Sequence, residues 1–559
     1  SEEREKLKKE LFGFKRCTEH GFINKPSCMD YDPKLQLLAI GNKQGYIKIL
    51  GQPGVEFCGE LKSGASVNQL FFLQEEGRVL SLCADNTITL WEINDKGGNT
   101  VLEDVKEFKF SAEESKFKNI SVCTLTKNKE HLLIGTEIGN IFMLDVKSFQ
   151  LLDQIIYQDV VMQNVPDDFK VNPGAVEAIA VHPTDPDKVL IGYNRGLIVL
   201  WDNKNSNTDQ TYNAIQQLES VCWHRNGQEF MSAHIDGSYT VWNAADSANP
   251  KEAPLTPYGP FPCKAISKVE WKTAKSDPFI IFSGGMPRAS YGDRHTISVM
   301  EGSNNHVVFD FTSKVIDFIA LGRADSTEDC EHDDPHCLIV LLEEELIVID
   351  LESPNWPTFQ NPYLNSLHSS PITCSHHVAN VPDALWQKIT DVGDSQTKNY
   401  SKREWPINGG ELKGAEGFSK DLHLTGHEDG TVKFWDASSV SMKLMYTLST
   451  AAMYNVDFHS GEQNSPEVEE EWPPFRKVGI YDPFSDDPRL GIQKISLCPL
   501  SETCVIAGTA GQVMVLQMER EEREYECTST MMNIVNDRDN FVWKGHDALK
   551  CRDTEVRYA

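Results

Sequence analysis

The chain is predicted to be all-β, because one short unit recurs along most of its length. The clearest copy runs from Leu422 to Asp436, where two strands of alternating apolar and polar residues flank Asp429-Gly430. This dipeptide favours the positive φ angles of a tight hairpin turn, and Trp435-Asp436 closes the second strand. A further short apolar strand precedes the hairpin in most copies, and the units repeat every roughly 40 to 57 residues, the pattern of a four-stranded β-propeller blade. The predicted fold is therefore a pair of tandem seven-bladed WD40-like β-propellers, the second one incomplete.

Nine hairpins follow one another in this pattern. The first seven turn at Gln44-Gly45, Asp85-Asn86, Gly139-Asn140, Arg195-Gly196, Asp236-Gly237, within residues 284–295, and at Glu343-Glu344. The eighth and ninth turn at Asp429-Gly430 and Ala510-Gly511. The periodicity inside each unit is two and not 3.6, which excludes a helical solenoid. Buried blade residues are expected at Trp91, Trp201, Trp242 and Trp435, with Asp429, Gly430 and Asp436 shaping the eighth hairpin.

Seven blades complete one ring, so we predict a first propeller over residues 15–365 and the start of a second over residues 366–559. Two or three blades cannot close, because their side edges would stay unpaired. We expect the remaining blades to follow Ala559. Residues 1–14 place Leu7 and Leu11 on one side of a short amphipathic helix, which we interpret as a cap on the first sheet and not as a membrane anchor, because its apolar face is narrow.

The composition restricts the class of partner. The chain has 559 residues, with 83 acidic and 53 basic side chains and a formal net charge of −30. Such a surface repels nucleic acid and anionic lipid. The 14 cysteines are scattered, mostly in apolar strands, and no secretory signal accompanies them, so reduced thiols in the cytosol are expected.

Three insertions are the predicted sites of function, because loops carry function in a fold with a generic core. They are residues 284–295, 379–420 and 459–490, each expected to be a loop, and the last contains an acidic run at Glu467 and Glu469–Glu471. Exposed aromatic side chains beside Arg and Lys are typical of partner-binding surfaces, although loops packed on their own domain have the same composition. The candidate partner-binding residues are Met286, Arg288, Tyr291, Arg294, Lys402, Arg403, Trp405, Phe475, Arg476, Lys477 and Tyr481.

No catalytic pattern is found. The sequence has no phosphate-binding Gly-rich loop, no nucleophile elbow and no kinase or zinc-protease motif. Cys330, His332, His336 and Cys337 are ligand types that zinc prefers, but the spacing is unsuitable and we interpret the stretch as an acidic surface loop. Since His and Asp near hairpin turns commonly hydrogen-bond across a blade, we give His427 and Asp429 a structural role. We therefore predict that the chain is not an enzyme and that it holds no cofactor or metal.

Several stretches resemble the lethal giant larvae proteins, which are related to tomosyn. They are distributed over nearly the whole chain: Glu19–Phe22, Ala39–Gly41, Gly51–Glu56, Ile134–Glu137, Asn194–Gly196, Ser283–Pro287, Trp405–Gly410, Thr425–Asp436 and Phe541–His546. Three further stretches are more similar to the lethal giant larvae branch than to tomosyn: Ser283–Asp293, Phe311–Asp317 and Pro474–Asp487.

The resemblance implies tandem seven-bladed propellers and a noncatalytic scaffold at the cell cortex that acts in cell polarity. It implies three partners: atypical protein kinase C with its polarity adaptor, nonmuscle myosin II, and plasma-membrane SNAREs of the syntaxin class in polarised exocytosis. A tomosyn-like inhibitor of SNARE assembly is the alternative. The family's basic, phosphorylated, membrane-binding segment would follow the Phe541–His546 stretch, so we expect membrane contact only through residues beyond this chain.

Overall fold

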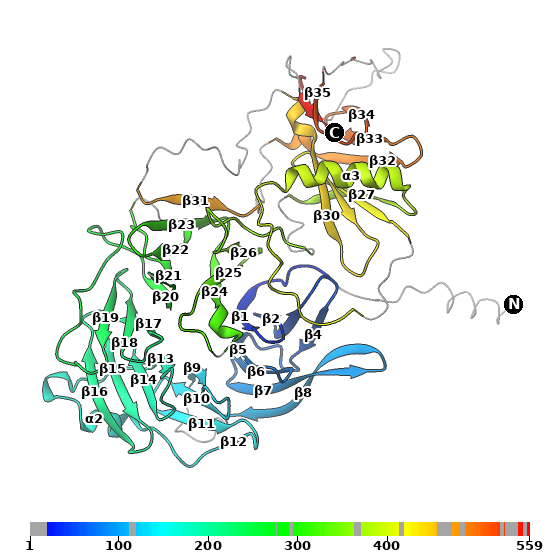
Figure 1. Cartoon of the computed structure of the whole chain (residues 1–559). Helices are drawn as coiled ribbons and strands as arrows, with labels where there is room; N and C mark the ends of the chain where they lie inside the picture. Colours follow the sequence, from blue (N-terminus) through cyan, green and yellow to red (C-terminus); the bar gives the residue numbers. More distant parts are fainter. Residues whose placement is uncertain are drawn as a thin grey trace.

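The computed structural model of the chain is composed almost entirely of antiparallel sheets (Figure 1). It describes residues 20–558 except 111–118, 276, 290–293, 328, 363–369, 413–418, 455–471, 481–486, 526–529, 531–545 and 552–555. The helix expected over residues 1–14 lies outside the described residues. No helix in the described part of the chain is long and apolar enough to cross a membrane.

The first four sheets each contain four strands in sequence order. Sheet 1 contains β1 (Pro26–Asp32), β2 (Leu37–Asn42), β3 (Tyr46–Leu50) and β4 (Glu56–Glu60). Sheet 2 contains β5 (Val67–Leu73), β6 (Arg78–Cys83), β7 (Thr87–Lys96) and β8 (Asn99–Lys109). Sheet 3 contains β9 (Ile120–Leu125), β10 (His131–Thr136), β11 (Ile141–Asp145) and β12 (Gln150–Leu151). Sheet 4 contains β13 (Val176–Val181), β14 (Lys188–Tyr193), β15 (Leu197–Asp202) and β16 (Asn207–Asn213), and α2 (Gln158–Gln163) precedes it.

The next three sheets vary the same plan. Sheet 5 contains β17 (Leu218–Trp223), β18 (Glu229–His234) and β19 (Tyr239–Asn243). Sheet 6 contains β20 (Ile266–Thr273), β21 (Pro278–Gly284), β22 (His295–Glu301) and β23 (Asn305–Phe311), to which a remote strand, β31 (Phe475–Val478), is added. Sheet 7 contains β24 (Val315–Gly322), β25 (Pro335–Leu342) and β26 (Leu346–Asp350). The seven predicted hairpins of this first array are thus confirmed, each as the second and third strand of its sheet.

Hydrophobic clusters join each of these sheets to the next. Sheets 1 and 2 share one cluster, and the same holds for each following pair up to sheets 6 and 7. A further cluster joins sheet 7 to sheet 1, with Ile40 of β2 and Ile339 of β25 both almost fully buried in it. The core of the first array therefore consists of contacts between consecutive sheets, in a cyclic order.

Two more sheets form a second array. Sheet 8 contains β27 (Ile372–Val378), β28 (Leu422–His427), β29 (Thr431–Asp436) and β30 (Lys443–Ser449), and sheet 9 contains β32 (Ile492–Cys498), β33 (Thr503–Gly508) and β34 (Val513–Gln517). β35 (Arg523–Tyr525) pairs with β36 (Val556–Tyr558).

Short 3-10 helices occur in both arrays, at Asp167–Phe169, Arg323–Asp325, Thr450–Met453 and Pro488–Leu490. Gly430, at the turn of the eighth hairpin, has the expected positive φ of 84°.

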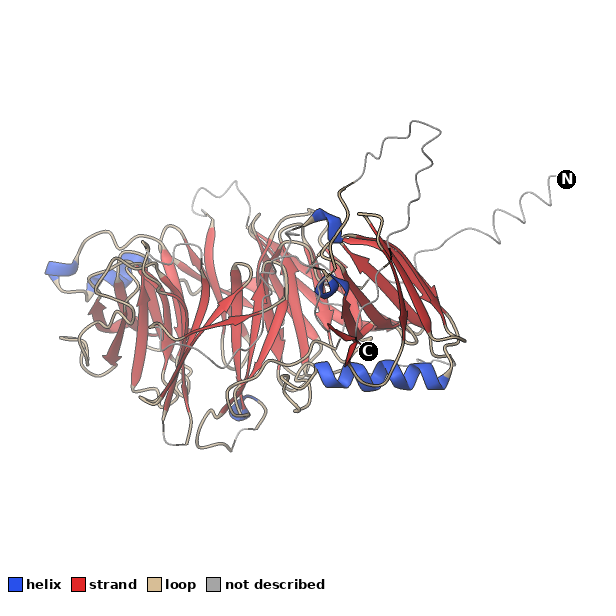
Figure 2. Ribbon diagram, turned by 90° about the horizontal axis from the view of Figure 1, so that it is seen from above, coloured by secondary structure: helices blue, strands red, loops and turns tan. Residues whose placement is uncertain are grey.

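The expectation of a plain loop over residues 379–420 is wrong in its first part. This part contains α3 (Asp383–Gln396), the longest helix in Figure 2, which lies along one side of the second array. It follows Pro382, and its buried residues Leu385, Ile389 and Val392 have helical spacing and pack with sheets 8 and 9. Apolar residues at intervals of three and four form one face of a helix, so the signal was present in the sequence.

Residues 401–410 of the same insertion return to the first array. The Tyr31 hydroxyl donates to the Pro406 carbonyl oxygen at 2.7 Å, and Ile407 is fully buried in the cluster between sheets 1 and 7. Gly409 approaches the main chain of Gln36 so closely that a Cβ atom there would lie 1.8 Å from the Leu35 carbonyl oxygen. Residues after the predicted domain boundary at 365/366 therefore pack on sheets of the first array.

The blade tryptophans are buried and three of them follow one pattern. The indole nitrogen Nε1 donates at 2.9 Å to a hydroxyl ten residues earlier, in the pairs Trp91–Ser81, Trp242–Ser232 and Trp435–Thr425. Trp201 is 2% exposed, but Ile191 occupies the equivalent position, and Trp201 Nε1 has no partner among the described residues. These hydrogen bonds stabilise the hairpins, because a buried donor without an acceptor is costly.

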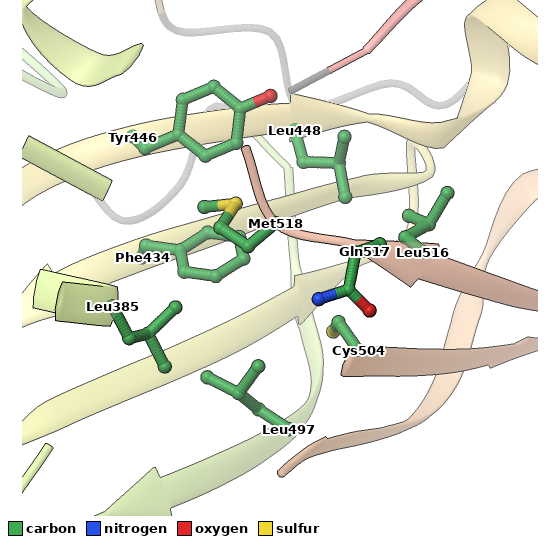
Figure 3. Close-up of a pocket in the computed structure, with 9 residues that line it drawn as sticks. All are labelled: Leu385, Phe434, Tyr446, Leu448, Leu497, Cys504, Leu516, Gln517 and Met518. Atoms are coloured by element: carbon green, nitrogen blue, oxygen red, sulfur yellow. The ribbon is translucent and has the colours of Figure 1, made fainter. Parts of the chain in front are cut away.

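Between the two sheets of the second array lies a small cavity (Figure 3). Leu385 of α3, Phe434 of β29 and Leu516 of β34 are among the side chains that converge on it. Its volume is about 10 Å³, roughly what a single water needs. This space is a packing gap of the core and not a ligand site.

Candidate interaction surface

The first insertion, residues 284–295, is partly built into the first array. Met286 is 1% exposed and belongs to the cluster between sheets 5 and 6. Arg288 is exposed, and its Nε donates to the Cys263 carbonyl oxygen at 3.1 Å. Tyr291 lies outside the described residues. Of the two described residues, Arg288 is placed where a partner could reach it and Met286 is not.

The structure brings two of the predicted insertions together. The Arg294 guanidinium carbon lies 3.9 Å from the centre of the Phe475 ring, and Arg294 Nη1 lies 3.3 Å from Asp310 Oδ2 on β23. A guanidinium stacked on an aromatic ring and paired with a carboxylate is satisfied within the chain. Arg294 and Phe475 therefore hold the third insertion on sheet 6.

Arg476 is also occupied within the chain. Its guanidinium donates to the carbonyl oxygens of Asn355 and Trp356, the latter at 2.7 Å, and lies 5.3 Å from the centre of the Phe309 ring. Its neighbour Lys477 is exposed. Tyr481 and the acidic run of this insertion lie outside the described residues. These contacts favour a structural role for Arg476 and leave Lys477 available to a partner.

In the second insertion, Arg403 lies against sheet 7. Its Nη1 donates to Asp350 Oδ1 at 2.7 Å and to the His336 carbonyl oxygen at 3.0 Å, while Nη2 lies 3.0 Å from Glu352. Burial raises the pKa of Asp350, but hydrogen bonds from Ser353, Ser401 and Arg403 outweigh it and lower the pKa to about 2. Trp405 packs edge-on against Phe359, with ring centres 6.0 Å apart, whereas Lys402 is exposed.

A cleft of about 340 Å³ opens beside Arg403, between sheets 1 and 7 and the returning segment. Tyr31, Asp325, His336 and Trp405 are among its lining residues. Burial, followed by the charge of Arg403, lowers the pKa of His336, so this imidazole is neutral at pH 7. The sequence marked Arg403 and Trp405 but missed Tyr31, on β1, and Asp325, in the 3-10 helix after β24.

The zinc candidate does not form a metal site in the described part of the chain. No group of three His, Cys, Asp or Glu side chains there is placed to hold a metal ion. Cys337 is 1% exposed inside β25, and burial raises the pKa of its thiol to about 12. His336 Nδ1 lies 3.1 Å from Cys337 Sγ, although alternation along the strand predicted opposite directions for the two side chains.

Sequence reasoning missed four exposed apolar side chains in loops of the first array. Val171, Ile215, Ile235 and Phe261 are 66%, 88%, 37% and 70% exposed, and we call this group the apolar loop surface. They lie in loops at sheets 4, 5 and 6. The available signal was an apolar residue inside a polar or Pro-rich loop, as at Ile215 and Phe261.

Hydrogen bonds join the loops that carry Val171, Ile215 and Ile235. The Arg195 side chain donates to the Asn172 carbonyl oxygen at 3.0 Å, and the Ala214 amide donates to the Gly196 carbonyl oxygen at 2.9 Å. The Ile235 amide donates to the Gln217 carbonyl oxygen at 3.1 Å. Exposed apolar residues on neighbouring loops are candidates for a protein-binding surface.

Comparison with known proteins shows similarity along nearly the whole chain. It is 47% identical over 564 residues to the mouse protein named Lethal(2) giant larvae protein homolog 1, an alignment that covers 98% of this chain and 54% of that protein. It is 45% identical over 564 residues to human LLGL scribble cell polarity complex component 2, with 99% of this chain and 55% of that protein covered. The chain belongs to the lethal giant larvae family.

Two further comparisons agree with membership of the lethal giant larvae family. The chain is 41% identical over 572 residues to Lethal(2) giant larvae protein of Drosophila pseudoobscura pseudoobscura, covering 98% of this chain and 48% of that protein. The LLGL family model, described as LLGL2, matches residues 254–357, which include most of sheets 6 and 7. The chain spans about half the length of the curated relatives that it matches.

Proposed function

We propose that this lethal giant larvae family chain is a noncatalytic, cytoskeleton-associated scaffold of cell polarity. The observation that carries the proposal is the 45% identity, over 99% of the chain, to a relative named as a scribble cell polarity complex component. Its partners in this proposal are atypical protein kinase C with its polarity adaptor, nonmuscle myosin II, and plasma-membrane SNAREs, through which it regulates polarised exocytosis. Its place is the cytoplasmic side of the cell cortex.

The architecture in this proposal is a closed seven-bladed propeller over residues 15–365, followed over residues 366–559 by the first blades of a second. Support comes from the cyclic order of the hydrophobic clusters, in which sheet 7 packs on sheet 1. Val513 and Val515 of β34 are 60% and 69% exposed, an apolar sheet face of the kind that a neighbouring blade covers. Propeller blades carry their loops at the two ends of the ring, where partners bind.

Within this proposal, partners bind to the apolar loop surface and to the exposed basic residues Arg288, Lys402 and Lys477. Exposed apolar anchors contribute most of the binding energy at protein interfaces, whereas charged residues at the rim mainly affect specificity and association rate. Arg294, Arg403 and Arg476 are paired inside the chain, so they contribute less to partner binding than their sequence context suggests.

The test is binding of the purified chain to the kinase and adaptor complex, to the myosin II tail and to a syntaxin-class SNARE. The double variant Ile215→Ser/Phe261→Ser is compared with the control Leu500→Ser, which removes a residue that is 87% exposed on sheet 9. We expect kinase-complex binding to weaken at least tenfold in the double variant only. Binding to the SNARE alone would favour the tomosyn-like alternative, and no binding to any of the three would contradict the scaffold proposal for these residues.

A further inference from the structure

The outer edge of sheet 6 carries a strand from a distant part of the chain. β31 pairs in parallel with β23 in the register Val308↔Phe475 to Phe311↔Val478 (Figure 1). The other paired strands in the described residues are antiparallel neighbours within a single array. An edge strand presents unpaired N–H and C=O groups, so it is a template for an added strand.

The two faces of β31 contact different parts of the first array. Phe475 lies under the Arg294 guanidinium and packs with the cluster between sheets 5 and 6. Arg476 and Val478 face the next cluster, where Arg476 lies over the Phe309 ring and Val478 is 6% exposed. Lys477 is exposed, so its side chain contributes little to the fit. The edge therefore contacts an aromatic residue, an arginine and an aliphatic residue at fixed spacing.

Additional contacts fix the position of this segment along the edge. Before β31, the Trp472 ring lies 5.2 Å from the ring centre of His306 but remains 62% exposed. After β31, the Ile480 amide donates to Glu345 Oε1 at 3.3 Å. A Cβ atom at Gly479 would lie 2.3 Å from the same oxygen, and Gly479 has a φ of 110° that glycine tolerates best. The approach to Glu345 thus requires a glycine.

The edge is longer than the strand that covers it. β23 contains seven residues, Asn305–Phe311, whereas the four residues of β31 pair only with Val308–Phe311. The outward main-chain groups of residues 305–307 take no part in this ladder. A longer extended segment would gain main-chain hydrogen bonds there.

We propose that the outer edge of sheet 6 is a strand-accepting site for an extended peptide of another protein with an aromatic–Arg–any–aliphatic sequence. The chain's own residues 472–480 fill the site at rest. Main-chain pairing supplies affinity in this kind of recognition, while the pockets on alternate sides supply specificity. The tethered segment competes at an effective concentration on the order of mM, so a partner must displace it. This site goes beyond the proposed scaffold function and does not depend on it.

The test uses a fluorescent peptide with the sequence of residues 472–480, titrated onto the purified chain. In the variant Phe475→Asp/Val478→Asp the chain's own strand is disabled and the edge is left intact. We expect this variant to bind the peptide at least tenfold more tightly than the wild type. Replacing the arginine of the peptide by alanine should abolish that gain, because Arg476 lies over the Phe309 ring and donates to main-chain carbonyl groups. Replacing its lysine should leave the gain unchanged, because the Lys477 side chain is exposed.

A matched pair of chain variants tests the edge itself. In the strand-disabled background, Arg294→Ala should weaken peptide binding at least fivefold, because Arg294 covers Phe475. Arg288→Ala, in the same insertion, should not weaken it. Absence of peptide binding to a strand-disabled chain that melts like the wild type would overturn the proposal, as would equal effects of the two arginine variants.

Hydrogen exchange of the wild-type chain decides the question even if the strand-disabled variant fails to fold. The amide of Val308 points towards the added strand, as does that of Asp310 two residues later. Local release of β31 predicts that these two amides exchange faster than those of the adjacent β22, and that excess peptide slows their exchange. Exchange of β23 as slow as that of β22, unaffected by peptide, would show a permanently fixed strand and contradict the proposal.

Discussion

Replacing Ser232 by alanine should destabilise the first array strongly for so small a change. Trp242 Nε1 donates to Ser232 Oγ at 2.9 Å, and Ser232 Oγ lies 2.8 Å from His234 Nε2. His234 Nδ1 faces the Gln217 carbonyl oxygen at 3.3 Å, which places the ring proton on Nδ1 and lets the hydroxyl donate to Nε2. Burial lowers the pKa of His234, in keeping with a neutral ring. The hydroxyl therefore satisfies two buried groups at once.

The magnitude follows from that double role. A buried donor or acceptor left without its partner costs about 1–3 kcal/mol, and Ser232→Ala affects one of each. We expect a loss of about 2–4 kcal/mol in the free energy of unfolding, since small shifts recover part of the cost. Urea unfolding followed by tryptophan fluorescence and circular dichroism measures it, with the slope checked for constancy.

Sheet 4 allows the reverse change, in which a hydroxyl is added near a tryptophan and not removed. Ile191→Thr introduces a hydroxyl ten residues before Trp201, whose Nε1 has no partner among the described residues. The substitution removes the Cδ1 methyl group, worth about 0.5–1.5 kcal/mol, and replaces the Cγ1 methylene by the hydroxyl. The new hydrogen bond should offset most of this loss and leave stability within about 1 kcal/mol of the wild type. If Ser232→Ala costs no more than Ile191→Thr, the reasoning about shared hydroxyls is wrong.

Three further predictions concern single side chains. Trp435→Ala should cost roughly 3–5 kcal/mol of unfolding free energy, as a large-to-small core change, and an unchanged melting curve would refute the burial of this ring. Arg403→Ala should cost about 1–3 kcal/mol because it leaves the buried Asp350 carboxylate with fewer donors, whereas Lys402→Ala should have no measurable effect in the same denaturation assay. Burial raises the pKa of Asp30 to about 7, with a hydrogen bond from the Phe72 amide opposing it. The folded state then holds a proton that the unfolded state releases above about pH 4, so wild-type stability falls as pH rises towards 7. Asp30→Asn should remove this fall, and stability curves that stay parallel across that range would contradict the assignment.

The repeated hairpins could be predicted from the sequence because each depends on local signals. Asp429-Gly430 lies in the expected turn, and short apolar or alternating runs on either side of such turns mark the strands. The less visible elements were those set by distant contacts. The strand Phe475–Val478 pairs with β23 across more than a hundred intervening residues, and no periodicity within four residues can indicate that partner.

The partner-binding residues were predicted less well than the hairpins, because a sequence does not show which charged groups pair within the chain. Arginine beside aromatic residues indicates a surface that binds something, but the sequence does not say whether the bound groups belong to the same chain. Arg403 binds Asp350 on sheet 7, and Arg476 binds main-chain carbonyl groups after β26. Ile215 and Phe261 carry no such signature, yet both side chains are exposed.

Charged and apolar contacts respond differently to salt, so the salt dependence of partner binding can show which kind forms the interface. A chain with a formal net charge of −30 attracts basic partners at long range, and that attraction is screened within about 8–10 Å at physiological ionic strength. The arginines that could reverse the charge locally are neutralised within the chain, as Arg294 is by Asp310 and Arg403 by Asp350. Contacts through Ile215 and Phe261 are apolar and are not weakened by salt. An association rate that falls with salt at an almost constant dissociation rate would therefore identify charge steering followed by apolar docking, and the reverse pattern would place the interface on a charged loop instead.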